Sequence, residues 1–317
     1  MNFRPTALGV MLAVLLTPAH AVIVDAGLPR YESREIAPPK NASYVTPTGA
    51  ITVVGYNDMT EMLTALGARF GELHPGFAFA WDLPGTKAAP AALAAGKSAF
   101  APMGAEMTPP QLADYEKITH APPLVFRLAH ASLNPRALSG SLAIFVHKDN
   151  PRTMITLAEL TEIFSGADAV ANWQPCGVEG DAALGLFFRE RVRMGQAFAK
   201  NFAGFPQSAE VVKRVGEDVR AIGFAAAMRA TPAVKILALA TRAGDTPVAL
   251  TEENLEAGRY PLDRHLLICV RPPIEPWLRE FLRFALSRDG QELVAAGTLG
   301  YLPLNAHDAT EELAGLR

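Results

Sequence analysis

The chain has 317 residues, half of them apolar, and a formal net charge of −3 at pH 7. It contains no block of basic residues, so the sequence does not indicate nucleic acid or an acidic membrane surface as a partner. The length is typical of two domains, and we expect the partners to be small molecules or proteins.

The first 21 residues are typical of a secretory signal peptide. Arg4 precedes an apolar run from Ala7 to Leu16, and the small residues Ala19 and Ala21 mark a cleavage site after Ala21. We considered a membrane anchor instead, but the apolar run is too short to cross a bilayer. The N-terminus therefore predicts export and a periplasmic location.

The chain has two cysteines, Cys176 and Cys269. Export would permit a disulfide between them, but two distant cysteines define no framework, so the bonded and the free forms both stay open. Neither cysteine has a CxxC or CxxH neighbour, and the seven histidines are scattered without metal-ligand spacing. The sequence therefore predicts no metal site.

From residue 51 onward, strands and helices alternate. Residues 22–47 show no sustained period and predict a loosely ordered leader. The β-branched run ITVV (51–54) predicts a strand, and apolar residues at helical spacing over 59–73 predict a helix that ends at HPG. FAFAW is the next strand, GTKAAPAALAAGKSAF predicts a second helix, and Thr108-Pro109 predicts the start of a third.

The second half of the chain continues this alternation. The run Leu142 to Val146 predicts a buried strand, and Thr156 with Glu159 at capping-box spacing predicts a helix that ends at Gly166. DAALGLFFRERV, SAEVVKRV, AIGFAAA and KILALA follow, RHLLICV predicts another strand, and two closing helices precede GYLPL (300–304), which we expect to end the ordered body. The whole pattern predicts an α/β fold.

Several stretches coincide in order and spacing with the periplasmic phosphate-binding proteins of ABC transporters. They include ITVVG, GTKAAPAAL, AIFVHKDNP, LAELTEIFSG and NWQPCG. The most specific are LTEENLEAGRYPLDRHLLICV and EFLRFALSRDGQELVAAGTLGYLPL, near the C-terminus. Together these stretches lie between residues 50 and 304, so the chain resembles this family over most of its length.

The resemblance implies a two-lobed, type II periplasmic-binding-protein-like fold, in which each lobe is a mixed sheet flanked by helices. One lobe would hold residues 48–140 and 262–317, and the other residues 141–261. In such a receptor the lobes close around a solute, and the closed form docks on a membrane permease. The resemblance implies no cofactor, and we expect a monomer.

The family's phosphate contacts in the first lobe fall on two turns of this sequence. In the first turn, Asn57 and Asp58 stand where the family has small hydroxyl residues, and Met59 follows them. In the second turn, Thr86 keeps a hydroxyl at a helix start, beside Lys87. The resemblance therefore predicts a ligand site at these five residues, with one of the family's hydroxyl groups retained.

The remaining two contacts are also altered. The segment APMGAEMT places Gly104, which has no side chain, where the family has a polar or acidic residue. The segment CGVEGDAAL lacks the family's arginine and hydroxyl residues, and instead presents Gly177, Glu179 and Asp181. We expect this turn, from Gly177 to Asp181, to line the other side of the cleft.

Asp58 and Glu61 allow two roles, which can hold together. Asp58 can cap the helix with Glu61 reaching back in a capping box, or Asp58 can face the cleft and accept a hydrogen bond from the ligand. Asp181, ahead of AALGLFF, raises the same choice. Either role disfavours phosphate, because like charges about 4 Å apart repel by about 4 kcal/mol at an effective dielectric near 20. We therefore expect an altered or weakened phosphate site.

Two other classes of function were weighed against a receptor. GxSxG, HExxH and GK[ST] signatures are absent, and His147 is interpreted as a solvated turn residue, so we expect no enzyme. Tyr56 and Trp81 lie close to strand ends and could contact a ligand. The alternative to a transport receptor is the same fold reused as an interaction or sensory module with no small ligand, whose cleft would be filled by its own side chains.

Overall fold

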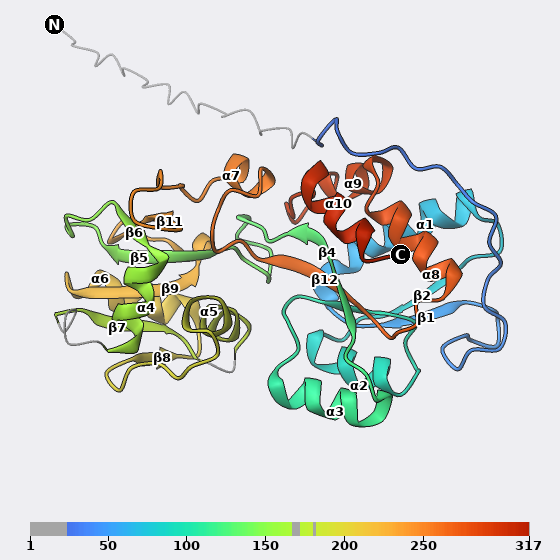
Figure 1. The fold of residues 1–317 in the computed structure, drawn as a ribbon, viewed down its shortest axis with the longest axis horizontal. Helices are drawn as coiled ribbons and strands as arrows, with labels where there is room; N and C mark the ends of the chain where they lie inside the picture. Colours follow the sequence, from blue (N-terminus) through green and yellow to red (C-terminus); the bar gives the residue numbers. More distant parts are fainter. Residues whose placement is uncertain (1–23, 167–171, 180–181, 317) are drawn as a thin grey trace, which may run out of the picture.

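The helices and strands form two groups (Figure 1), and each group encloses a core of buried side chains. The computed structural model describes residues 24–166, 172–179 and 182–316, so the predicted signal peptide 1–21 and Asp181 lie outside the described residues. One core is built from residues 28–137 and 266–316, and we call this part of the molecule the first lobe. The other core is built from residues 142–262 together with Leu302, and we call it the second lobe. Each lobe combines sheets with flanking helices, which confirms the predicted α/β class.

In the first lobe, the two ends of the chain fold together around short sheets. Strands β1 and β2 pair in parallel, and β12 is antiparallel to both β3 and β4. The strands are β1 (Ile51–Val54), β2 (Phe79–Asp82), β3 (Ala101–Met103), β4 (Leu124–His130) and β12 (His265–Val270). The helices are α1 (Thr60–Leu73), α2 (Ala89–Ala94), α3 (Pro109–Thr119), α8 (Pro276–Ala285), α9 (Arg288–Ala295) and α10 (Ala306–Ala314).

The apolar stripe predicted over 59–73 packs the first-lobe core. Phe70 of α1 is fully buried, and its ring meets Phe281 of α8 edge-on with centroids 5.3 Å apart. The predicted helix start at Thr108 is confirmed, because Thr108 and Gln111 form a reciprocal capping box. These local signals place α1 and α3 as expected.

The second lobe is built on a five-stranded sheet in the order β10-β5-β9-β7-β8, beside a parallel pair of β11 and β6. The strands are β5 (Leu142–His147), β6 (Met154–Thr156), β7 (Gln174–Val178), β8 (Ala203–Phe205), β9 (Ala221–Ala226), β10 (Val234–Ile236) and β11 (Ala238–Ala240). The helices are α4 (Leu157–Ser165), α5 (Ala183–Arg193), α6 (Ser208–Gly216) and α7 (Glu252–Glu256). The predicted capping box of α4 is confirmed, since Glu159 N–H donates to Thr156 Oγ1 and Thr156 N–H donates to Glu159 Oε2.

The leader is bound to the first lobe, and the expectation that residues 22–47 are loosely ordered is wrong for the part described from residue 24. In Figure 1 this dark blue segment runs over α9 and α10 and down the side of the lobe. Leu28 is buried in the first-lobe core, Tyr31 N–H donates to Asp289 at 2.8 Å, and Ala306 N–H donates to Asp25 at 2.9 Å. Contacts with the first lobe fix the path of the leader, which forms no regular element among its described residues. Its sequence therefore shows no hydrophobic period.

The C-terminus also continues beyond the expected end of the ordered body. Helix α10 begins after Asn305, whose side chain caps it by accepting from Asp308 N–H. Cys176 lies on β7 and Cys269 on β12, in different sheets, and both are buried free thiols. The structure therefore has the free form of the two cysteines. None of the helices in the described residues is long and apolar enough to cross a membrane.

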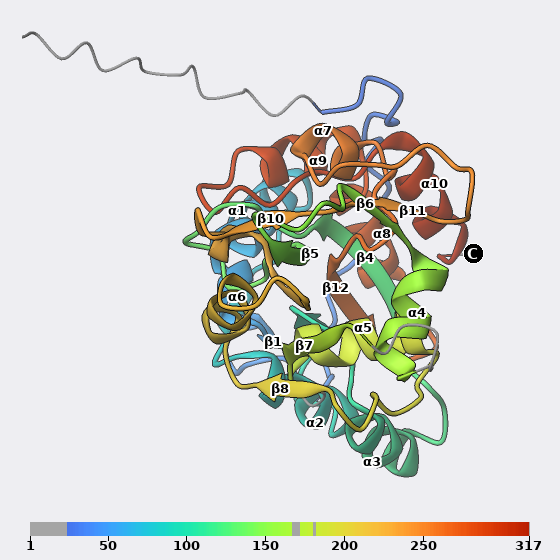
Figure 2. The same ribbon diagram turned by 90° about the vertical axis from the view of Figure 1, so that its left-hand side faces the viewer.

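Two strands carry the chain between the lobes. Strand β4 leads out of the first lobe and β12 leads back into it, and Figure 2, with the second lobe toward the viewer, shows both lying behind that lobe's sheet. The two strands pair antiparallel, with His130 opposite His265. The segment 131–141 after β4 and the residues just before β12 therefore lie where the two lobes meet.

Candidate functional site

Three turns meet at the carboxyl ends of β1, β2 and β3. Gly85 N–H donates to the Gly55 carbonyl at 2.9 Å, which joins the first two turns. Tyr56 N–H donates to the Pro102 carbonyl at 2.9 Å, and Gly104 N–H donates to Thr86 Oγ1 at 3.1 Å, which joins the third. Ligands of open α/β sheets lie at this kind of edge. We therefore take these turns as the first-lobe side of the candidate site.

The hydroxyl of Thr86 is engaged within the protein. It accepts from the backbone N–H of Gly104, so the retained hydroxyl group holds two of the three turns together. Gly85, with φ of +133°, lets the chain turn immediately before it, a conformation that side-chain-bearing residues rarely adopt. Thr86 thus stands at the predicted site, where it has a structural partner.

Tyr56 and Ser139 fill the space against Gly104. A Cβ at Gly104 would lie 2.5 Å from the Tyr56 ring and 2.8 Å from Ser139 Oγ, so only glycine fits there. Ser139 Oγ lies 3.1 Å from both the Tyr56 hydroxyl and the Gly104 carbonyl. Tyr56 is buried, with 8 % of its surface exposed. Gly104 is therefore a close-packing position, and Tyr56 covers it.

Asp58 does not cap α1, so this part of the capping interpretation is wrong. Residues 57–59 form a 3₁₀ turn, α1 begins at Thr60, and neither element has a side-chain cap. The Asp58 carboxylate instead accepts from Leu138 N–H at 2.8 Å and from the Tyr301 hydroxyl. The Asp58 carboxylate thus joins two segments. One is the connection between the lobes, at Leu138, and the other is the C-terminal part of the first lobe, at Tyr301.

Glu61 behaves in the same way. Its Oε2 accepts from the backbone N–H of Thr298 at 3.0 Å and from the Thr298 hydroxyl at 2.8 Å, so it does not reach back to its own helix. A cavity lined by Asp58, Glu61 and Tyr301 has a volume of only about 10 Å³. That is room for about one water, so the two carboxylates are packed against the 297–301 segment.

Burial keeps the tyrosines of the site protonated. Burial raises the pKa of Tyr56. It also raises the pKa of Tyr301, and there the nearby Tyr56 and the Asp58 carboxylate add to the effect of burial. A protonated Tyr301 donates to the Asp58 carboxylate, which leaves that carboxylate with a hydroxyl and a backbone donor. Asp58 is therefore stabilised where it stands without a bound ligand.

Arg264 is a residue of the candidate site that no local pattern indicates, although it lies in the distinctive segment LTEENLEAGRYPLDRHLLICV. Its guanidinium is fully buried and donates to the Gly140 carbonyl at 2.7 Å and to the Gly104 carbonyl at 3.1 Å. It also lies over the Phe187 ring of α5, 5.7 Å from the centroid. Arg264 thus joins the first-lobe turn, the connecting segment and a helix of the second lobe.

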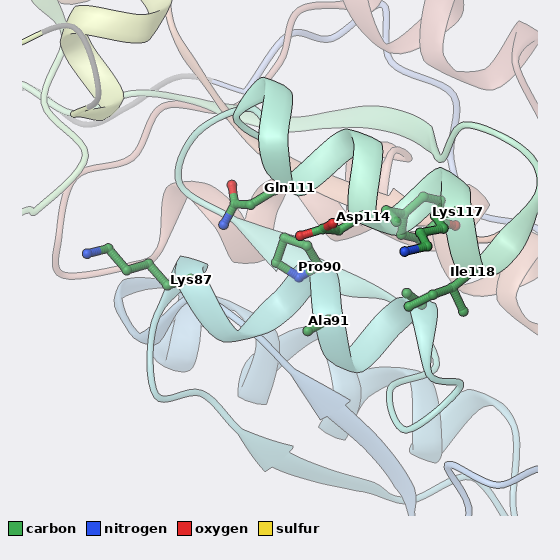
Figure 3. A pocket seen from close by; sticks show the side chains of 9 residues that line it. Lys87, Pro90, Ala91, Gln111, Asp114, Lys117 and Ile118 are labelled. Atoms are coloured by element: carbon green, nitrogen blue, oxygen red, sulfur yellow. The ribbon is translucent and has the colours of Figure 1, made fainter.

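Asn57 and Lys87 are exposed, whereas Met59 is fully buried and belongs to the first-lobe core. Lys87 lies at one end of a groove of about 510 Å³ between α2 and α3, whose lining includes Gln111 and Ile118 (Figure 3). Met59 therefore packs, and Lys87 lies in the wall of a separate groove. Of the first-turn residues, Asn57 and Asp58 stay at the site.

The second-lobe turn is placed differently from the expectation. Gly177 lies inside strand β7, paired with both β8 and β9, and a Cβ there would come within 2.2 Å of the Phe224 ring. It is a packing position of the sheet, so the prediction that Gly177 belongs to a turn is wrong. Glu179 follows the strand and is exposed, with its N–H donating to the Phe205 carbonyl. Asp181 lies outside the described residues, and α5 begins without a side-chain cap.

A sequence-family model described as the PBP superfamily domain matches residues 42–289. The chain belongs to the PBP superfamily. It is 30% identical over 318 residues to the phosphate-binding protein PstS of Pseudomonas aeruginosa strain PAO1, with 92% of each chain covered, which places it in the family of phosphate-binding proteins of ABC transporters. Strain UCBPP-PA14 of the same species has a PstS protein with the same identity and coverage.

Solved structures support the fold of this PBP-superfamily chain. An ABC-type phosphate transport receptor from Vibrio cholerae aligns with a TM-score of 0.52 and 20% identity, over 80% of this chain and 99% of that one. PstS from Borrelia burgdorferi aligns with a TM-score of 0.53 and 13% identity, over 80% and 98%. At these identities the likeness concerns the fold, which is that of a two-lobed binding protein.

Proposed function

We propose that this chain is an exported solute-binding protein of an ABC importer whose phosphate site is altered. The solute would lie where the turns after β1, β2 and β3 face the second lobe. The family relationship supports the receptor role, and the predicted signal peptide supports a periplasmic location. In this role the two lobes would close on the solute, and the closed form would dock on a membrane permease.

The observation that carries the altered site is the position of the Asp58 carboxylate. It accepts from Leu138 N–H at 2.8 Å and from the Tyr301 hydroxyl, two donors that would otherwise be available to a bound oxyanion. By the resemblance, Asp58 stands where relatives have a small hydroxyl residue. The chain's own carboxylate would therefore take the place of part of the ligand's charge.

Electrostatics then disfavours a second anion at this position. An oxyanion about 4 Å from the Asp58 carboxylate is repelled by about 4 kcal/mol at an effective dielectric near 20. That corresponds to about three powers of ten in affinity. Lys87 is exposed and lines the groove between α2 and α3, so its charge is poorly placed to offset the repulsion. We expect phosphate to bind weakly, and a neutral or cationic solute group to be preferred beside Asp58.

Isothermal titration with phosphate at neutral pH tests the altered site, with Asp58→Thr as the decisive variant. The wild type is expected to give no micromolar phosphate binding, and Asp58→Thr is expected to bind phosphate at least about 100-fold more tightly, since the repulsion is removed. Asp58→Asn keeps the shape and an acceptor oxygen while it removes the charge, and it should gain in the same direction.

Glu61→Gln is the matched control, because Glu61 carries the same charge one turn away and contacts Thr298. It should leave phosphate binding unchanged. Micromolar binding by the wild type would contradict the altered site, and so would equal gains in the Asp58 and Glu61 variants. Thermal shift with oxyanions, amino acids and sugars then tests the receptor role, since a solute that binds the folded chain raises its melting temperature. Failure of every solute would favour an interaction or sensory module instead.

A further inference from the structure

The buried ends of the two connecting strands carry a cluster of metal-ligand side chains. His130 is the last residue of β4, His265 is the first residue of β12, and the two are directly opposite in the antiparallel register. Their rings lie with centroids 4.8 Å apart. Asp263 precedes His265 by two residues, and its Oδ2 lies 2.6 Å from His130 Nδ1 and 3.5 Å from His265 Nε2.

The cluster is enclosed by the protein. The side chain of His130 has no exposed surface, and those of Asp263 and His265 are 9% and 13% exposed. Asp308 of α10 faces it from the other side, with Oδ2 at 3.8 Å from His130 Nε2. The neighbouring Arg264 points away from the cluster, toward the carbonyls described above.

Three buried polar atoms of the cluster lack a hydrogen-bond partner among the described residues. They are His130 Nε2, Asp263 Oδ1 and His265 Nε2. A buried polar atom without a partner costs about 1–3 kcal/mol, so such atoms are rare unless an ion or water serves them. Three of them in one cluster point to a bound species that these side chains would hold.

We propose that His130, Asp263 and His265 bind a divalent transition-metal ion between β4 and β12. Each residue can offer one ligand atom so that all three atoms lie within 4.8 Å of one another. Zinc takes imidazole nitrogen and carboxylate oxygen ligands at about 2.0–2.2 Å, so two of its ligands are at most about 4.2 Å apart. Binding therefore needs only a small inward movement of the side chains.

The donor atoms of the cluster suit a transition-metal ion. Arg127, which lies beside the cluster, is already paired with Asp308, Glu311 and Glu312. Asp263 and Asp308 are the carboxylates that face the imidazoles, with oxygens 2.6 and 3.8 Å from His130, while the guanidinium groups of Arg127, Arg191 and Arg264 lie near His265. A His₂Asp set with nitrogen and oxygen donors favours zinc over calcium or magnesium, which prefer oxygen ligands only.

The metal ion would join β4 and β12, the two strands that connect the lobes. His130 comes before the connecting segment 131–141, and His265 follows Arg264, whose guanidinium bonds Gly140 and Gly104. A metal ion here would hold together the ends of β4 and β12 that lie next to the second lobe. This inference concerns the connection between the lobes and does not depend on which solute the cleft binds.

The experiment uses the full chain, stripped with EDTA and dialysed against micromolar zinc, with metal analysis of the protein. We expect one zinc per chain and a higher melting temperature with zinc than with EDTA. Cobalt in its place should give the visible absorption of a four-coordinate site with nitrogen and oxygen ligands. Less than half an equivalent of zinc at micromolar concentration would overturn the proposal, whatever any variant does.

Variants locate the ion. His265→Gln and Asp263→Asn, at the two less deeply buried positions, should weaken zinc at least about 100-fold, because loss of a second-shell partner alone costs 10–100-fold. His307→Gln is the matched control, since His307 lies on α10 one residue before Asp308 but its side chain is 82% exposed. Equal loss in His307→Gln, or full binding in His265→Gln, would show that the metal binds elsewhere and overturn the assignment.

Discussion

Replacing Arg264 with methionine tests whether the connection between the lobes depends on this one guanidinium. Methionine keeps an apolar body against Phe187 but removes the donors to the Gly140 and Gly104 carbonyls, at 2.7 and 3.1 Å. A hydrogen bond from a charged group contributes about 1.5–3 kcal/mol. Gly104 keeps a second donor in Ser139 Oγ, whereas the Gly140 carbonyl loses its arginine donor.

The expected loss is therefore smaller than the sum of the two bonds. Burying a charged guanidinium is itself costly, and an apolar side chain avoids that cost. We expect Arg264→Met to lower the free energy of unfolding by about 3 kcal/mol, which corresponds to a fall of about 5 °C in melting temperature for a chain of this size. Arg264→Lys should also destabilise, since an ammonium group cannot present the planar fork that reaches both carbonyls.

Urea unfolding followed by circular dichroism, together with calorimetry at pH 7, measures both variants. Arg259→Met is the control, because Arg259 lies nearby in the sequence, is exposed, and pairs with Glu253 at the surface. Surface pairs contribute at most about 1 kcal/mol. A loss in Arg264→Met within about 0.5 kcal/mol of that control would refute the reasoning.

Two further predictions concern the leader and the cysteines. The Ala306 and Gly27 N–H groups lower the pKa of Asp25, so its contribution is complete above the unfolded value near 4 and is lost as the pH falls through the lowered pKa. Asp25→Ala should therefore cost about 1 kcal/mol at pH 7 and progressively less below pH 4, by urea unfolding; a pH-independent difference would contradict this. Burial raises the pKa of Cys176 and of Cys269 to about 12, so a thiol reagent should label neither in the native protein and both after denaturation without reductant, and fewer than two labels would indicate a disulfide.

Sequence reasoning succeeded where the signal lies within one turn of the chain. The capping box at Thr156 forms as the spacing predicts, and α3 starts after Thr108 as Thr108-Pro109 predicts, because each signal belongs to a single helix start. The same reasoning was wrong for Asp58 and Glu61. Their partners Leu138 and Thr298 are 80 and 237 residues away, and no local pattern reports such a contact.

The remaining errors have the same origin. The segment CGVEGDAAL has the composition of a turn, but the pairing of β7 with β8 and β9 extends the strand through Gly177. The leader lacks periodicity, yet contacts with Asp289 and Ala306 order it. The meeting of His130 with His265, 135 residues apart in sequence, is a further contact that no local pattern reports, because the register of β4 and β12 sets it.

The sequence by itself determined the α/β class, the course of most helices and strands, and the family, because periodicity, caps and ordered motifs are properties of neighbouring residues. Only the tertiary structure decided what the charged and polar groups do. Asp58, Arg264 and His130 each meet partners brought from distant segments, and the packing of those segments sets the direction of every such hydrogen bond. A side chain's role in this protein therefore depends on which strands pair and which segments cross, and that outcome is settled by the whole fold.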